Sequence, residues 1–369
     1  MPPILLCFIV LLTTMNAAEP NAVANAWLAK AKIAPPLPVP ATLAAWQQQR
    51  IQIRTKLNDL LGDLPPRPPT SAFQIISRED KGSYTLETLQ FDNGAGEIVK
   101  GYVFVPKTAT AQSKAPAILY CHWHGGQYDI GKQELLQTNA TPVAAGPALA
   151  SAGYVVLGID APCFGERNGQ GPDGPQQKGG SGEMTAAKFN LWVGRTLWGM
   201  MLRDDLTALD YLCSRPEVDA QRIGVTGISM GSTRSWWIMA LDDRPRAAVC
   251  VGCMTRYEEL IRAGMLKAHG IYYFVPGMLK HFDTEAVIAL GAPRPTLFMT
   301  GDQDGGSPTD GVRHIGEIVS QVYALHGQDA ASHFENTIYP GVGHVYLPEM
   351  WEKTVKWMDR WVKNGSPAR

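Results

Sequence analysis

The sequence lacks the features that mark several classes of protein. Lys and Arg number 33 against 34 Asp and Glu, so a net charge of −1 provides none of the basic surface of a nucleic-acid-binding protein. We find no internal repeat, no heptad run and no long block of one charge sign. No apolar run reaches the ~18 residues of a membrane-spanning helix. These absences exclude solenoids, coiled coils and polytopic membrane proteins.

Cysteine is also scarce. Cys7 lies in the apolar N-terminal run, and the other five of the six cysteines are spread over the rest of the 369 residues. That density excludes a disulfide-stapled scaffold, and the odd count leaves at least one free thiol or an intermolecular bond. Cys250 and Cys253 form a lone C-x-x-C, so we expect buried small side chains there rather than a zinc site.

What is present is typical of a globular protein with a leader. Hydrophobic residues make up 45% and charged residues 18%. Residues 4–12 form an apolar run followed by small and polar residues, which predicts a signal peptide at 1–18 and a periplasmic or secreted protein. An N-terminal membrane anchor is the alternative, because no Lys or Arg precedes the run. Residues 19–72 are predicted to be an extension, with an extended Ala/Pro-rich lead-in up to residue 45 and one helix at 46–61 packed on the core.

Residues 73–369 carry the pattern of one α/β domain. Short β-like runs at 73–105, with an Asn93-Gly94 turn, predict antiparallel hairpins. Buried apolar runs then alternate with amphipathic helices, which predicts a mainly parallel central sheet with an antiparallel N-terminal edge and helices on both faces. Two long segments, a glycine-rich stretch at 161–194 and the segment 254–292, are expected beside the site. The buried runs lie at 117–121, 154–160, 222–229, 247–253 and 295–301.

The strongest motif is Gly227-Ile228-Ser229-Met230-Gly231, which matches G-x-S-x-G between a predicted strand and a predicted helix. A serine on such a sharp turn projects its hydroxyl from the sheet, and the flanking glycines allow the close backbone approach. The helix N-terminus supplies amides for a developing oxyanion, the first from Met230. We therefore predict Ser229 as a nucleophile.

A serine nucleophile needs a base and an acid that orients the base. His344 follows a strand-like run and precedes the last helix, so it is the candidate base. Asp302 and Asp304 both follow the strand at 295–301. We favour Asp304, because Asp302 suits a turn residue that bonds the backbone.

The loop after the strand at 117–121 is expected to complete the oxyanion hole. Its residues His122 and His124 have no carboxylate or third histidine at ligand spacing, so we expect them to brace the loop and predict no metal. Trp123 and Gln127 on this loop are candidate substrate-binding residues. Arg167 is a third: it either binds a substrate carboxylate or, the interpretation we favour, braces its loop by pairing with Glu166 or Asp160.

Together these residues resemble the α/β-hydrolase superfamily, and within it the bacterial dienelactone hydrolase and acetyl xylan esterase-like hydrolases. The resemblance covers residues 116–362, with HWHGG at 122–126, DAPCFGER at 160–167, GDQDGGSP at 301–308 and PGVGH at 340–344. The family pattern G-x-x-D-x-x-x-P falls on Gly301, Asp304 and Pro308. The resemblance implies an α/β-hydrolase fold, a Ser229-Asp304-His344 triad, and Gly126 as second oxyanion donor, with Gln127 the alternative. Met230 stands where many acetyl xylan esterases have Gln.

These observations predict a cofactor-free serine carboxylic-ester hydrolase that acts through an acyl-enzyme on short-acyl esters, such as acetylated carbohydrate or similar small esters. No nucleic-acid partner is expected, and no membrane partner after removal of the leader; the oligomeric state is open. Three alternatives stay open: a serine peptidase of the same fold, an esterase of uronate esters, and a binding module that kept the fold without catalysis.

Overall fold

A computed structural model describes residues 21–365; the predicted signal peptide at 1–18 lies outside them. Within the described part, no helix combines the length and the apolar character needed to cross a membrane.

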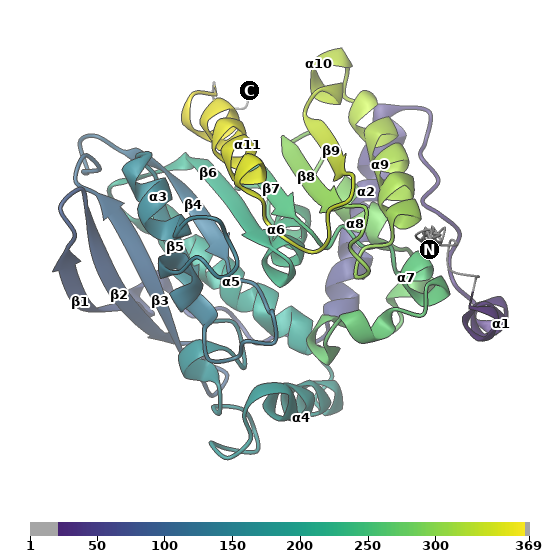
Figure 1. Ribbon diagram of the computed structural model, residues 1–369, viewed down its shortest axis with the longest axis horizontal. Helices are drawn as coiled ribbons and strands as arrows, with labels where there is room; N and C mark the ends of the chain where they lie inside the picture. Colours follow the sequence, from purple (N-terminus) through teal and green to yellow (C-terminus); the bar gives the residue numbers. More distant parts are fainter. Residues whose placement is uncertain (1–20, 366–369) are drawn as a thin grey trace, which may run out of the picture.

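One nine-stranded sheet organises the chain, in the order β1-β2-β3-β5-β4-β6-β7-β8-β9 (Figure 1). The first three strands pair antiparallel with one another, and β3 pairs antiparallel with β5. All pairings from β5 through β4 to β9 are parallel. The predicted mainly parallel sheet with an antiparallel N-terminal edge is thereby confirmed. The strands are β1 Gln74–Asp80, β2 Tyr84–Asp92, β3 Ile98–Pro106, β4 Ala115–Cys121, β5 Val155–Ile159, β6 Val218–Ile228, β7 Ala247–Val251, β8 Thr296–Gly301 and β9 Phe334–Tyr339.

Helices cover both faces of the sheet, because the central strands are apolar on both sides. Along β4, alternate side chains enter two different cores: Leu119 packs in the cluster that includes α5 and α6, and Ile118 in the one that includes α3 and α11. The helices are α1 Ala22–Lys30, α2 Leu43–Leu61, α3 Ala145–Ser151, α4 Gly179–Trp192, α5 Leu197–Ser214, α6 Met230–Leu241, α7 Tyr257–Arg262, α8 Thr284–Ala289, α9 Thr309–Ala324, α10 Gln328–Ala331 and α11 Pro348–Met358.

The N-terminal extension shares the core of the sheet. Trp46 and Leu57 on α2 are fully buried in the same cluster as the central strands. One expectation was wrong: residues 19–45 are not wholly extended, since they include α1. Asn21 caps that helix by accepting a hydrogen bond from the Ala24 amide at 3.1 Å, and Ala and Leu favour the helical backbone that follows.

The glycine-rich stretch 161–194 also contains a helix that the sequence did not predict. Helix α4 begins at Gly179 and lies away from the sheet, at the bottom of the view in Figure 1. Its glycines at 179, 180 and 182 made the segment look like a continuous loop. The helix lies against the short 3₁₀ turn η5, Ile271–Tyr273, within the long segment after β7. Helix α4 therefore packs the glycine-rich stretch 161–194 against the segment after β7.

Candidate active site

The backbone at Ser229 has the geometry of a sharp strand-to-helix turn. Ser229 lies between β6 and α6 with φ 60° and ψ −122°, a region that L-residues rarely adopt. The motif glycines explain how the turn is accommodated, because a Cβ at Gly227 or Gly231 would lie 2.2 or 1.9 Å from the carbonyl oxygen of Cys121. Only glycine at these two positions permits the Ser229 turn to approach β4 this closely.

His344 and Asp304 form a hydrogen-bonded pair that lines the same cavity as this serine. His344 Nδ1 lies 2.7 Å from Asp304 Oδ2. The Asp304 side chain is 3% exposed and its other oxygen accepts the Gly306 amide at 3.0 Å. Burial disfavours the imidazolium, but the hydrogen bond and charge of Asp304 outweigh burial and raise the pKa of His344 above its ordinary value. Asp302 instead accepts the Gly341 amide at 2.8 Å, the turn role expected for it.

Ser229, Asp304 and His344 line one cavity of about 550 Å³. The segment after β7 contributes much of the opposite wall through Lys267, His269 and Tyr272. No hydrogen bond joins Ser229 Oγ to His344 within residues 21–365; the contact recorded for that oxygen is Cys253 Sγ at 3.9 Å. Serine–histidine bonds of this kind are often long in unliganded enzymes. Burial raises the pKa of the Cys253 thiol to about 12, so this thiol stays protonated beside the serine.

Backbone amides near Ser229 are the candidate oxyanion donors. Met230 is the first residue of α6, so its amide has no carbonyl partner within the helix. On the loop after β4, the Gly126 amide donates to His124 Nδ1 at 3.0 Å, and the Gln127 amide donates to the His124 carbonyl at 2.9 Å. Among the described residues, the amides of His124 and Gly125 have no acceptor. Gly126, expected as the second donor, is thus engaged elsewhere, as is Gln127.

Buried polar groups fix the start of this loop. Glu134 is fully buried and accepts the Trp123 amide and the Tyr120 hydroxyl, each at 2.6 Å. Burial raises the pKa of its carboxyl to about 7, against the effect of these hydrogen bonds. His122 accepts the Ala161 amide at its Nε2 at 3.0 Å and bonds the Trp123 carbonyl through Nδ1. Burial lowers its pKa well below the ordinary value, so it braces the loop as a neutral ring.

Comparisons with known proteins show the family of the chain. The model of the Abhydrolase family matches residues 29–334, more than half of the chain. The "Putative hydrolase YtaP" of Bacillus subtilis is 37% identical over 316 residues, which are 85% of this chain and all of that protein. The chain belongs to the Abhydrolase family.

Solved structures of this hydrolase fold extend the likeness at low identity. A "putative acetyl xylan esterase" of Bacteroides fragilis superposes with a TM-score of 0.69 at 20% identity, over 94% of this chain and 90% of that one. The glucuronoyl esterase of Solibacter usitatus gives 0.62 at 18% identity, over 86% and 93%. At these identities the likeness shows the α/β-hydrolase fold, which the sequence predicted.

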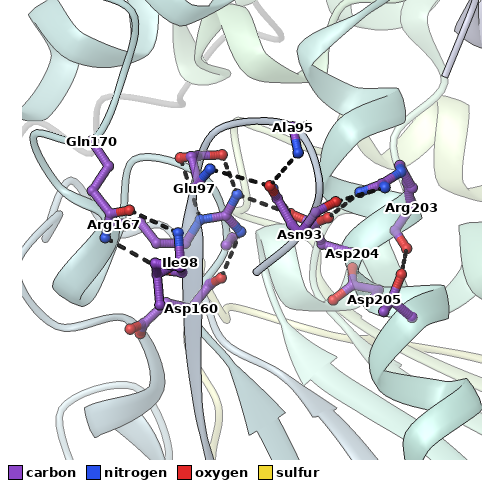
Figure 2. Close-up of polar contacts among 12 residues, drawn as sticks. Asn93, Ala95, Glu97, Ile98, Asp160, Arg167, Gln170, Arg203, Asp204 and Asp205 are labelled. Atoms are coloured by element: carbon purple, nitrogen blue, oxygen red, sulfur yellow. Dashed lines mark hydrogen bonds and ion pairs between the residues drawn. The ribbon is translucent and has the colours of Figure 1, made fainter. Parts of the chain in front are cut away.

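The structure corrects the assignment of Arg167 as a substrate-binding residue of this hydrolase. The Arg167 side chain is 0% exposed and pairs with Glu97 and, at 2.9 Å, with Asp204 (Figure 2). Its Nη1 donates to the Asp160 carbonyl at 3.0 Å. The bracing role that we favoured is confirmed, but its carboxylate partners are Glu97 and Asp204 rather than Glu166 or the Asp160 side chain. No nitrogen of this guanidinium faces the cavity.

Trp123 and Gln127 are likewise absent from the cavity wall in the described chain. The Trp123 ring packs beneath the loop, where a Cβ on Gly125 would lie 2.6 Å from it. Gln127 is exposed and bonds Asn139 at 3.5 Å. Within residues 21–365, no group of three or more His, Cys, Asp or Glu side chains is arranged to hold a metal ion.

Sequence reasoning missed several residues of this region. A Cβ on Gly252 would lie 3.1 Å from the His344 ring, so this glycine makes room for the dyad. Glu134 and Glu183 support the loop after β4 from outside it. The glycine between Cys250 and Cys253 was a usable signal, since it directly follows a buried strand. The two glutamates had none, because their partners lie outside any local motif, 11 positions away for Glu134 and 59 for Glu183.

Proposed function

We propose that this hydrolase cleaves carboxylic esters through Ser229, His344 and Asp304, with short-acyl esters of carbohydrates as substrates. The observation that carries the proposal is the strained Ser229 turn opening into the same cavity as the 2.7 Å His344–Asp304 pair. The combination of nucleophile, base and orienting acid is what acyl transfer requires.

In the proposed reaction Ser229 Oγ attacks the ester carbonyl while His344 Nε2 takes its proton. Asp304 holds the Nδ1–H tautomer and stabilises the imidazolium. His344 then protonates the leaving alcohol, and water hydrolyses the acyl-enzyme by the same route. The Met230 amide binds the oxyanion, and the unpaired amide of His124 or Gly125 supplies the second hydrogen bond. Each donor raises kcat by ~10²–10³-fold.

The cavity supports a small polar substrate. Its wall is built largely from glycines and polar side chains, among them His124, His269 and Lys267. Acetyl xylan esterase and glucuronoyl esterase are the names of two structural neighbours, which is consistent with a carbohydrate ester. Lys267 lines the cavity and forms no ion pair with any described residue, so its ammonium can pair with the carboxylate that hydrolysis of a uronate ester releases. Uronate esters are therefore the second candidate substrate class.

Hydrolysis of p-nitrophenyl esters from acetate to decanoate tests the proposal, with wild type, Ser229→Ala and Ser235→Ala compared. Ser235 lies on the same helix and donates to the Gly231 carbonyl, so its variant is the matched control. We expect short-chain activity that is lost in Ser229→Ala and kept in Ser235→Ala. Full activity in Ser229→Ala, or no labelling of Ser229 by a fluorophosphonate, would refute the proposal. Acetylated xylan and methyl glucuronate then separate the two substrate classes.

A further inference from the structure

A second carboxylate–imidazole pair borders the cavity of the Ser229 turn. Glu183 on α4 lies with its Oε2 2.9 Å from His124 Nε2, and its side chain is 3% exposed. We propose that Glu183 is a positioning residue, which fixes the proton of His124 on Nε2 and thereby holds the loop that carries the oxyanion donors. This inference rests on the proposed ester hydrolysis.

The hydrogen bonds of His124 allow one tautomer only. The Gly126 amide donates to Nδ1 at 3.0 Å, so Nδ1 carries a lone pair. The single N–H of the neutral ring is then on Nε2 and faces Glu183. An ionised carboxylate only accepts hydrogen bonds, so Glu183 enforces the same assignment from the other side.

The shape of the loop depends on this tautomer. Two of its amides end on His124: Gly126 on the ring and Gln127 on the carbonyl oxygen, at 2.9 Å. The amides of His124 and Gly125 are left without a partner among the described residues. A proton on Nδ1 would face the Gly126 N–H directly, and the turn would have to open. The direction of the unpaired amides would then change.

The ring cannot avoid this conflict by rotating. It stacks on Tyr272 at 5.0 Å between centroids, and Tyr128 and Phe164 contact it edge-on at 5.0 and 4.9 Å. The Tyr128 hydroxyl also donates to Glu183 Oε2 at 3.3 Å. The position of the proton is therefore the variable that Glu183 controls.

Stability of the fold does not explain why a glutamate occupies position 183. Within residues 21–365 it has no Lys or Arg partner, and a buried carboxylate without a cation is unfavourable for the fold. Space is also reserved for it, since a Cβ on Gly270 would lie 2.7 Å from Glu183 Oε1. Because both ring nitrogens of His124 are occupied, the pair does not act as a second general base; it acts through the loop.

Two substitutions of His124 separate its two hydrogen bonds. His124→Asn places an oxygen near the position of Nδ1 and keeps the acceptor for Gly126. His124→Gln places an amide nitrogen near the position of Nε2 and keeps the donor to Glu183. We expect His124→Asn to retain kcat within about tenfold. His124→Gln is expected to lose on the order of 10²-fold in kcat, as for a displaced oxyanion donor.

Glu183→Gln completes a double-mutant cycle. A carboxamide both donates and accepts, so both tautomers of His124 become possible. When His124 is present, we expect Glu183→Gln to lower kcat about tenfold with little change in KM. The reason is that the second tautomer of His124 misaligns the oxyanion-binding amides of the loop. In the His124→Asn background we expect no further loss. Glu87→Gln, on the remote strand β2, is the matched control for replacing a buried glutamate and leaves kcat unchanged.

The proton on His124 is read directly from two-bond ¹H–¹⁵N spectra of the histidine rings. The expected result is an Nε2–H ring in the wild type and a mixture in Glu183→Gln. An Nδ1–H ring in the wild type, or an equal loss of kcat from Glu183→Gln in both backgrounds, would overturn the proposal. Absence of ester hydrolysis and of Ser229 labelling in the wild type would overturn the proposed function instead, and the spectra distinguish that outcome.

Discussion

Replacing Arg167 by Met tests whether this residue serves stability or substrate binding. The guanidinium is fully buried between Glu97 and Asp204 (Figure 2). Methionine has a similar apolar stem but no charge, so the variant removes the cation and leaves both carboxylates behind. Since no part of Arg167 lines the cavity of the Ser229 turn, we expect the free energy of unfolding to fall and the kinetics to stay unchanged.

The loss in free energy of unfolding depends on which partners Glu97 and Asp204 retain in the variant. Removing one partner of a buried ion pair costs about 3–5 kcal/mol. Asp204 is fully buried but retains Arg203 Nη1 at 3.0 Å and Asn93 Nδ2 at 3.3 Å, and the Glu97 side chain is 18% exposed and reaches water. We therefore expect the lower end, about 3 kcal/mol, which corresponds to a melting temperature lower by about 4 °C for a domain of this size.

The assay combines thermal and urea unfolding with steady-state kinetics on a short-chain ester well below the melting temperature. The double variant Arg167→Met/Asp204→Asn is the control, because it also removes the stranded charge and should recover part of the lost stability. An unchanged melting temperature together with a several-fold higher KM would refute our reasoning and return Arg167 to the substrate.

Three further predictions concern the site. The raised pKa of His344 predicts that kcat/KM rises with pH through a pKa above the ordinary value of 6.5, and Asp304→Asn should lower that pKa and kcat; a profile centred below 6.5 in the wild type would contradict it. The stabilising contribution of His344 is then fully present below pH 6.5 and is lost as pH rises through the folded-state pKa, which urea unfolding at several pH values measures. Gly231→Ala should cost about 1–3 kcal/mol and most activity, because its Cβ would lie 1.9 Å from the Cys121 carbonyl oxygen. Gly171→Ala, whose nearest neighbour would lie at 3.9 Å, is its control, and equal melting temperatures of the two variants would count against the steric argument.

The sequence alone determined the sheet and predicted which candidate site residues follow the ends of its parallel strands. Central strands buried on both faces are continuous apolar runs, so β4 to β8 were predictable from local composition. The Ser229 turn was predictable because the glycines that its close backbone approach requires lie within the same five residues. The positions of His344 and Asp304 followed from the same rule, that chemistry gathers where parallel strands end. Helix α4 was missed because glycines at its start mimic a loop.

Only the tertiary structure decided which groups near the site are free to act. The sequence could not identify the partners of Arg167, because Glu97 and Asp204 come from a turn before β3 and from α5, far away in sequence. The Gly126 amide is engaged by a ring whose tautomer depends on Glu183, 59 positions from His124. A motif places a residue type on a turn through local sterics. The hydrogen-bond partners of a buried donor depend on which segments the fold brings together, and no local pattern contains that information.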